Sequence, residues 1–211
     1  MSGPRKIPFA KKCRYMAEAV LAHVIYGLFR ILPIEWSSGL GGTLLRLIGP
    51  RMGISRVARR NLDLAFPEKT PSEKRKIISG MWENLGRVLG EYPHLRNMAG
   101  RAEVLGQEYF DAARASGKSA IFFGGHLANW EIKAVCSQAL GLPLHLIYRK
   151  PNNPYVDRLL QHARALDDGG RYIPKGAAGA RAIRNVFRPN GVLALLVDQK
   201  LNDGMARSEE H

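Results

Sequence analysis

Residues 119–131 read SAIFFGGHLANWE, and this stretch decides the fold of the second half of the chain. Its four apolar residues, flanked by small ones, predict a buried strand, and residues 129–140 predict a helix. Gly124 and Gly125 separate the two elements and would allow a tight exit from the strand. We therefore expect His126 at a strand-to-helix turn, outside the helix.

Outward from this stretch, strand patterns alternate with helical patterns as far as residue 197. This alternation is typical of an α/β fold with a largely parallel sheet flanked by helices, in which ligands bind outside the carboxyl ends of the strands. His126, Arg149 and Asp198 each follow a predicted strand end, so we expect them to converge. The expected elements are strands at 119–123, 144–148, 171–173 and 192–197, and helices at 129–140, 154–167 and 177–187.

His126 and Glu131 are placed five residues apart, a spacing that suits proton transfer when the histidine stands outside the helix. A neutral imidazole held by a carboxylate can take a proton from a hydroxyl, with Glu131 fixing the tautomer and stabilising the imidazolium. The alternative is a structural or surface histidine. His162 and Asp167 repeat the spacing within one predicted helix. The spacing alone is therefore a weak signal, and the strand and glycine context selects His126.

The chain is strongly basic, with 32 Lys and Arg against 18 Asp and Glu among 211 residues, a net charge of +14. Residues 1–100 carry 17 basic and 7 acidic side chains, a net +10. This charge predicts an anionic partner: nucleic acid, an acidic carrier protein, an anionic membrane or a phosphorylated lipid. A hydrophobic content of 45% excludes a disordered chain. Cys13 and Cys136 are isolated, which predicts reduced thiols and no metal site.

The amino-terminal segment 15–34 is apolar nearly all round and follows a basic cluster, which predicts a membrane-seeking helix. Because charged residues interrupt it, we favour interfacial insertion over a span, with an ordinary buried helix as the alternative. We accordingly divide the chain into a basic, membrane-seeking segment at 1–34 and an α/β domain at 35–211. Within the helical section that follows, the residues from Pro71 predict the start of a long helix toward Glu91.

Motifs of several other enzyme classes do not occur in the sequence. The Gly-Lys-Ser triplet at 117–119 has Ala112 where a phosphate loop needs glycine, and it precedes a strand. The glycines at 39–49 miss the dinucleotide fingerprint, and there is no G-x-S-x-G elbow. No nucleic-acid recognition module has its signature here. We therefore expect no cofactor and no nucleic-acid partner.

Several blocks in this order and spacing resemble the lipid A biosynthesis late (lauroyl/myristoyl) acyltransferase family, over about residues 15–205. The resemblance implies a glycerolipid acyltransferase-like fold at the cytoplasmic face of the inner membrane. It also implies transfer of a fatty acyl chain from acyl carrier protein to a hydroxyl of an anionic lipid A precursor. The blocks are RNLDLAFPEKT (60–70), WENLGRVLGEY (82–92), FFGGHLANWE (122–131), IYRKPNNPYVDRLL (147–160) and GVLALLVDQ (191–199).

By this resemblance, His126 and Glu131 correspond to the catalytic pair of the family's H-x4-E motif. His126 would deprotonate the acceptor hydroxyl, and no covalent acyl-enzyme would be needed. Backbone N–H groups near Gly124 and Gly125 would stabilise the oxyanion.

The resemblance also implies residues that bind the lipid. Arg149, Lys150 and Arg164 match basic positions of the family and would hold phosphates or a sugar carboxylate, for which Arg is suited. Arg164 has the alternative reading of a solvated helix charge. Asp198, which matches a D-Q pair with Gln199, is grouped with these substrate-binding candidates, with a structural or orienting role expected.

The chain departs from the family pattern after residue 206, where it reaches RSEEH and stops. We therefore expect a domain truncated at its carboxyl terminus. Two alternatives to an active enzyme stay open: an inactive truncated acyltransferase, and a basic membrane- or nucleic-acid-binding module without catalysis.

Overall fold

The computed structural model describes residues 8–165, 170–187 and 191–198, and it divides the chain into two compact units. Unit 1 comprises Met1–Met98 and Pro151–Arg164, and unit 2 comprises Ala99–Lys150 and Ala165–His211. This division does not follow the expected boundary between residues 34 and 35. That boundary was drawn for membrane association, and it stays a prediction.

Unit 1 is helical. Residues 71–91 form one long helix, as expected, because Thr70 and Glu73 cap its start reciprocally: the Thr70 hydroxyl accepts from the Glu73 N–H at 3.3 Å, and the Glu73 carboxylate accepts from the Thr70 N–H at 2.8 Å. The elements of unit 1 are α1 (Phe9–Ile31), α2 (Ile34–Ile48), η1 (Gly49–Arg51), α3 (Ser55–Ala65), α4 (Pro71–Glu91), η2 (Tyr92–Asn97) and α7 (Pro154–Ala163).

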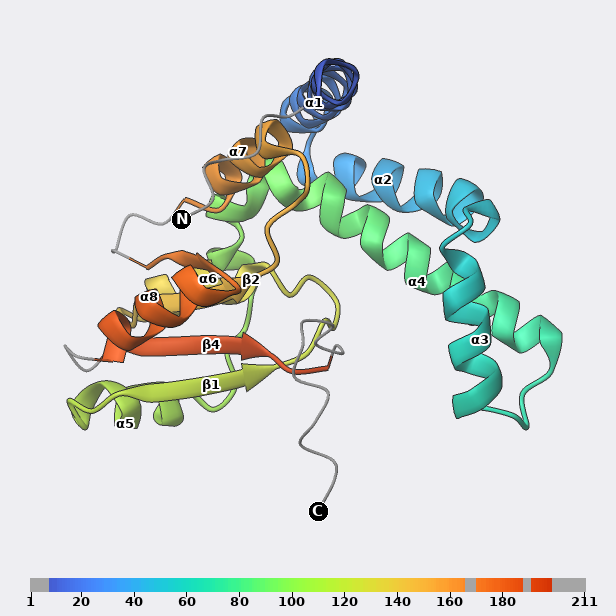
Figure 1. Ribbon diagram of the computed structural model, residues 1–211. Helices are drawn as coiled ribbons and strands as arrows, with labels where there is room; N and C mark the ends of the chain where they lie inside the picture. Colours follow the sequence, from blue (N-terminus) through green and yellow to red (C-terminus); the bar gives the residue numbers. More distant parts are fainter. Residues whose placement is uncertain (1–7, 166–169, 188–190, 199–211) are drawn as a thin grey trace. The chain divides into compact units, whose positions relative to one another are not determined.

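Helices α2 and α4 lie side by side over much of their length (Figure 1). Glycines make this close approach possible. A Cβ added at Gly86 would lie 2.1 Å from the Gly41 carbonyl oxygen, and one at Gly90 would lie 2.2 Å from the Ser37 carbonyl oxygen. The Ser38 hydroxyl adds a 2.6 Å hydrogen bond to Glu91. Gly41 and Gly42, which belong to no nucleotide motif, therefore serve helix packing, whereas a Cβ at Gly39 would meet nothing within 4 Å.

Helix α1 buries few of its side chains. Tyr15, Ala19 and Phe29 are buried, whereas apolar side chains such as Val24 and Leu28 are exposed. Among the described residues, no helix combines the length and the apolar composition needed to cross a bilayer. The exposed apolar side chains of α1 are compatible with insertion into a membrane interface, which stays a prediction.

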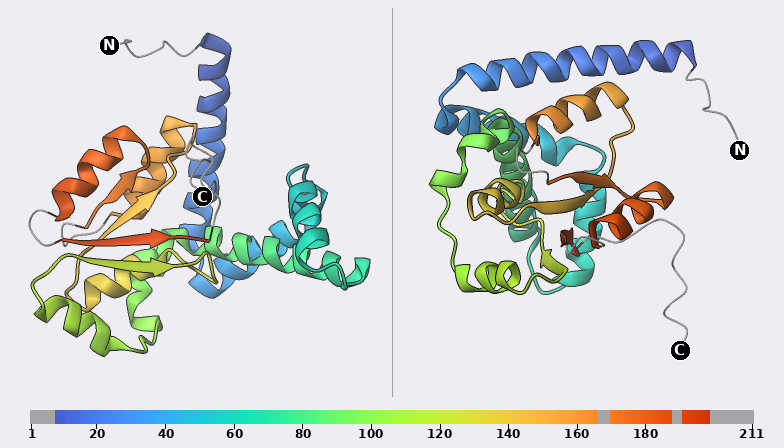
Figure 2. Two further views of the ribbon diagram at one scale, coloured as in Figure 1. Left: turned by 60° about the horizontal axis from the view of Figure 1, so that its bottom comes forward. Right: turned by 90° about the vertical axis from the view of Figure 1, so that its left-hand side faces the viewer.

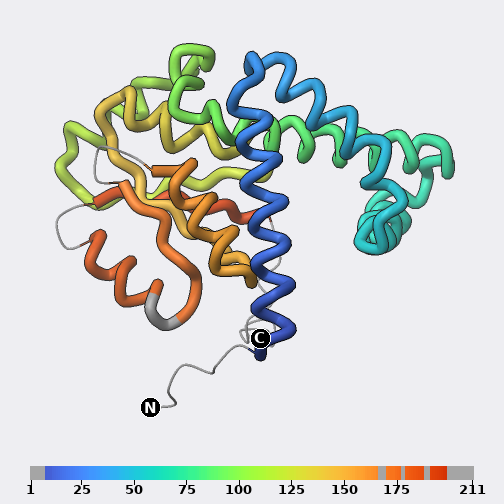
Figure 3. The backbone as a smooth tube through the Cα atoms, turned by 90° about the horizontal axis from the view of Figure 1, so that it is seen from above, coloured from blue at the N-terminus to red at the C-terminus, as the bar shows by residue number. Residues whose placement is uncertain are grey.

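Helix α7 belongs to unit 1 although it lies between two strands of unit 2 in the sequence, and it packs beside α1 (Figure 3). Asn153, which is buried, caps its start by accepting from the N–H groups of Tyr155 and Val156. The same side chain donates to the Tyr15 carbonyl oxygen at 2.8 Å and to Glu18 at 2.9 Å. One buried amide thus satisfies the helix end and fastens α7 to α1.

Unit 2 contains a four-stranded parallel sheet in the order β1-β4-β2-β3. The expected α/β fold class, a parallel sheet flanked by helices, is confirmed. The strands are β1 (Ala120–Gly124), β2 (Leu144–Tyr148), β3 (Tyr172–Pro174) and β4 (Val192–Leu196), and the helices are η3 (Ala99–Arg101), α5 (Gln107–Ala115), α6 (Ile132–Ala139) and α8 (Ala177–Phe187).

Alternate residues along each strand build the two faces of this sheet. On one face, Leu144, Val192 and Ala194 form a buried cluster with Ala134 of α6, and Phe110 of α5 packs against it. The other face, toward α8, is built by a second cluster, Ile173, Val186 and Leu193. Figure 2 shows α8 on one side of the sheet and α5 and α6 on the other. Both faces of the central strands are therefore covered, which leaves their ends for a site.

The expected bounds were confirmed for β2 and α8, and the ends of the other strands differ from their expected positions by at most one residue. The expected start of a helix at residue 129 is wrong, because α6 begins only at Ile132. Ala128 has φ 45°, a left-handed conformation that a helix cannot include, and the Asn129 side chain accepts from the Glu131 N–H at 3.0 Å in a local turn. Residues 125–131 are thus a connecting segment that holds His126 away from the helix.

Candidate active site

The candidate site lies at the carboxyl ends of β1 and β4. These strands pair in parallel with Gly124 opposite Leu196, and the Val197 N–H continues the ladder to the Gly124 carbonyl oxygen at 3.0 Å. A residue two positions beyond each strand therefore lies at the same edge of the sheet. His126 and Asp198 occupy these two positions.

A single carboxylate holds His126 in two ways. The His126 backbone N–H donates to Asp198 Oδ2 at 2.7 Å, and the imidazole Nδ1 lies 2.7 Å from Asp198 Oδ1. The side chain of His126 is 25% exposed. With Nδ1 donating to the carboxylate, the neutral ring carries its lone pair on Nε2, the nitrogen that can take a proton.

The charge of Asp198 is favoured by these contacts. The hydrogen bond from the His126 ring, followed by the one from its backbone N–H, holds the pKa of the Asp198 carboxyl below its usual value. The carboxylate is thus ionised at neutral pH, and it stabilises a protonated imidazole on the other side of the hydrogen bond. Such a pair can accept and return a proton.

Glu131 ends this connecting segment, directly before α6, and is 5% exposed. Its carboxylate accepts from the Trp130 indole N–H at 3.2 Å, and the Trp130 ring meets the His126 ring edge-on at 5.1 Å between centroids. The carboxylate on Nδ1 is Asp198, at the place where the sequence reasoning expected Glu131. A catalytic role for Glu131 stays a prediction.

The two glycines do not adopt an unusual backbone conformation, and only Gly125 lies where a side chain would be crowded. Neither Gly124 nor Gly125 has a positive φ, and the left-handed residue of the turn is Ala128. A Cβ at Gly125 would lie 3.3 Å from Asp198 Oδ2, closer than ordinary contact. Gly125 therefore leaves room for the carboxylate that orients His126.

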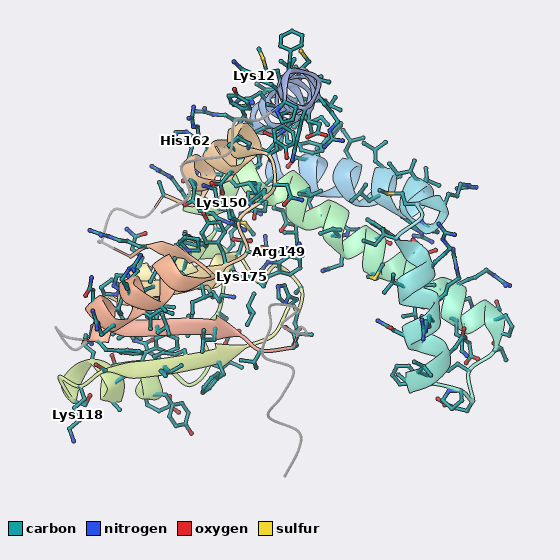
Figure 4. All side chains as sticks on the ribbon, viewed as in Figure 1. Lys12, Lys118, Arg149, Lys150, His162 and Lys175 are labelled. Carbon is teal, nitrogen blue, oxygen red and sulfur yellow. The ribbon has the colours of Figure 1, made fainter. Side chains whose placement is uncertain are left out.

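Two of the predicted basic residues follow β2. Arg149 and Lys150 are exposed, and they begin the segment that leaves the end of this strand (Figure 4). Because of the register between β2 and β4, Tyr148 at the end of β2 lies level with Leu196 at the end of β4. Arg149, the next residue, therefore follows β2 at the sheet edge where Asp198 lies. The sheet thus brings the ends of β1, β4 and β2 together, as the sequence predicted.

Arg164 lies in unit 1, at the end of α7. Its guanidinium donates to the Tyr92 hydroxyl at 2.6 Å and lies over the Tyr92 ring at 5.5 Å from the centroid. The reading of Arg164 as a solvated helix charge is therefore wrong, because the side chain is half-buried against Tyr92. Its role as a lipid ligand stays a prediction, and Gln199 lies outside the described residues.

Sequence reasoning underestimated two residues. Asp198 was expected to converge with His126 and to orient or bind substrate, but the role of holding the imidazole was assigned to Glu131, whereas the structure places Asp198 on Nδ1. Asn153 was passed over within the block at residues 147–160, although an Asn before Pro at a predicted helix start is a recognisable cap.

Comparison with known proteins gives consistent matches. A family model described as bacterial lipid A biosynthesis acyltransferase matches residues 6–208. The chain is 31% identical over 129 residues to the lipid A biosynthesis lauroyltransferase of Escherichia coli, covering 57% of this chain and 40% of that protein. It is 29% identical over 140 residues to the lipid A biosynthesis acyltransferase of Haemophilus influenzae, covering 63% and 43%. Each match thus spans about two fifths of the relative's own length.

Proposed function

The chain belongs to the bacterial lipid A biosynthesis acyltransferase family, and from this premise we propose that it transfers a fatty acyl chain from acyl carrier protein to a hydroxyl of a lipid A precursor, with His126 as general base. The observation that carries the proposal is the imidazole at the end of β1, held through Nδ1 by the Asp198 carboxylate at 2.7 Å. Such a ring offers Nε2 to a substrate hydroxyl.

The proton and bond changes of the reaction balance with the two substrates and this pair. His126 Nε2 removes the proton from the acceptor hydroxyl as its oxygen attacks the thioester carbonyl carbon. The tetrahedral intermediate collapses, the C–S bond breaks, and the departing thiolate takes the proton back from the imidazolium. An ester and a free thiol result, and the enzyme returns to its starting protonation state.

Asp198 acts in this proposal as a positioning residue. It fixes the tautomer and the orientation of His126, and its negative charge stabilises the imidazolium while the proton is on the ring. Glu131 would add a second negative charge on the side of Trp130. Backbone N–H groups near Gly124 and Gly125 would face the oxyanion, a contribution of about 3–4 kcal/mol for such donors.

Arg149 and Lys150 would bind the anionic headgroup of the acceptor. Their exposure and their place after β2 support this, because the acceptor hydroxyl must reach His126 at the same sheet edge. The guanidinium matches a phosphate or carboxylate in a bidentate way, and the lysine adds a point charge. Arg164 is a further proposed ligand of anionic lipid groups, because it is a guanidinium at a basic position of the family.

The proposed location is the cytoplasmic face of the inner membrane. The exposed apolar side chains of α1 and the positive charge of the amino-terminal half support this, since the former favour the acyl region and the latter favours anionic headgroups. Acyl carrier protein, an acidic partner in this proposal, would be attracted by the same charge.

The test is a transfer assay with an acyl carrier protein thioester and a lipid A precursor. His126→Ala should abolish transfer while far-UV circular dichroism stays unchanged. His162→Ala provides a matched control, because His162 is an exposed histidine on α7 (Figure 4) and should retain activity. Transfer that persists in His126→Ala, or a wild-type chain that transfers nothing, would refute the proposal.

A further inference from the structure

Helix α3 is fastened to the rest of unit 1 along one side. The Ser55 hydroxyl, fully buried, donates to the Gly49 carbonyl oxygen at 2.7 Å and accepts from the Trp82 indole N–H at 2.8 Å. Farther along, Asp63 pairs with Lys74 of α4 at 2.9 Å. Figure 1 shows α3 set beside the amino-terminal part of α4. The helix is therefore held in a defined orientation.

The opposite side of α3 carries an apolar stripe that faces solvent. Val57 and Leu64 are 58% and 75% exposed, and they lie about 20° apart around the helix. Ile54, before the helix, is 64% exposed and extends the stripe, and Phe66, after it, is also exposed. Exposing two large apolar side chains of α3, and two more at its ends, to water is unfavourable, and such a patch is typical of an interaction surface.

Two arginines, Arg60 and Arg56, lie about 40° and 80° around α3 from Leu64, on the sector beside this stripe, whereas Arg59 lies nearer to the buried Ser55. All but one of the helix's charges are thus positive, and the exception, Asp63, is paired with Lys74. Arg59 donates to the Pro50 carbonyl oxygen at 3.3 Å, which directs it along the surface of its own segment. An apolar stripe bordered by arginines is the pattern of a helix that lies in a membrane interface.

We propose that α3 is a second membrane-contacting element, which inserts Val57, Leu64 and their apolar neighbours into an anionic bilayer while its arginines bind lipid phosphates. The inference deepens the proposed membrane association and rests on it. It assigns to α3 a contact separate from α1, so that unit 1 would be held at the surface by two elements.

A bilayer fits this surface better than nucleic acid does. Lipid phosphates and acyl chains lie next to one another in an interface, so the arginines and the apolar stripe are satisfied together. A nucleic-acid backbone would use the arginines and leave the apolar stripe in water. The apolar stripe is therefore the observation that selects the partner.

In the experiment, Cys13→Ser and Cys136→Ala first remove the native thiols from the full chain. An environment-sensitive fluorophore is then attached to one introduced cysteine, Val57→Cys or Leu64→Cys. Vesicles of phosphatidylcholine with phosphatidylglycerol should shift the emission of both labels to the blue. Vesicles of phosphatidylcholine alone should give a much smaller shift, and RNA should give none.

Two further label positions separate this inference from membrane association in general. Val24→Cys reports on α1, and Leu105→Cys, at an exposed apolar side chain of unit 2, serves as the control. A shift at position 24 without one at 57 and 64 overturns the α3 contact and leaves association through α1. No shift at positions 24, 57 and 64 overturns both. A shift with RNA in place of vesicles also overturns the bilayer assignment.

The charge contribution is measured by vesicle sedimentation. Arg56→Gln combined with Arg60→Gln should weaken binding to anionic vesicles by about five-fold per arginine. Arg181→Gln combined with Arg184→Gln, on exposed positions of α8, removes the same charge from unit 2 and should have a smaller effect. Equal losses from both pairs would show that net charge alone acts, which overturns the contact through α3.

Discussion

Replacing Gly86 with alanine should separate α2 from α4. The added Cβ would lie 2.1 Å from the Gly41 carbonyl oxygen and 2.9 Å from the Gly42 Cα. These are backbone atoms on a packed helix, so no side chain can rotate to relieve the overlap. Restoring an ordinary contact of 3.4 Å requires the helices to part by about 1.3 Å.

Two opposing terms set the size of the effect. Overpacking of this kind costs about 1–3 kcal/mol, and the upper end applies because backbone must move on both helices. Alanine is a better helix former than glycine by about 1 kcal/mol, which offsets part of the loss. We expect a net decrease of about 2 kcal/mol in the free energy of unfolding.

Gly80→Ala is the matched control, because Gly80 lies in the same helix as Gly86 and a Cβ added there would meet nothing within 4 Å. This variant should gain up to about 1 kcal/mol from helix propensity. Urea unfolding followed by the fluorescence of buried Trp82, with Trp36→Phe and Trp130→Phe, reports on unit 1. At an m-value of about 2 kcal/mol/M, the Gly86→Ala midpoint should fall by about 1 M. Equal stability changes in the two variants would refute the close packing of α2 on α4.

Three other predictions concern unit 2 and the thiols. Asp198→Asn should lower the rate of acyl transfer by about 100-fold or more with little change in KM, because it misorients His126. Asp198→Glu should restore part of the rate. Equal steady-state rates for Asp198→Asn and the wild-type chain would exclude the positioning role. Because the pKa of the Asp198 carboxyl in the folded protein lies below the ordinary 3.8, this carboxyl should still be mostly ionised at pH 3.8 in a carboxyl 13C NMR titration. Its contact with His126 should therefore persist above that pH and be lost on further acidification. Half-protonation at pH 3.8 would contradict this prediction. Burial raises the pKa of the Cys136 thiol, whereas Cys13 is exposed, so alkylation followed by mass spectrometry should modify Cys13 first; the reverse order would contradict the placement of Cys136.

The sequence alone predicted several individual elements in both units. Residues 144–148 and 177–187 of unit 2 form the strand and the helix expected there, and residues 71–91 of unit 1 form the expected long helix. Side-chain periodicity and capping residues are local properties, so they can be recognised without knowledge of the rest of the chain. The start of the helix after β1 was predicted too early, because no residue type at 128 or 129 indicates that Ala128 adopts a left-handed conformation.

Tertiary structure decided which elements meet. The pairing of β4 between β1 and β2 brings Asp198 to His126 across 72 residues, and no spacing along the chain encodes that contact. Likewise, buried Asn153 draws α7 into unit 1 although the helix lies between two strands of unit 2 in sequence. Local hydrogen bonding forms a helix, and local side-chain alternation favours a strand, whereas the order of strands and the partners of buried polar groups depend on contacts between distant residues.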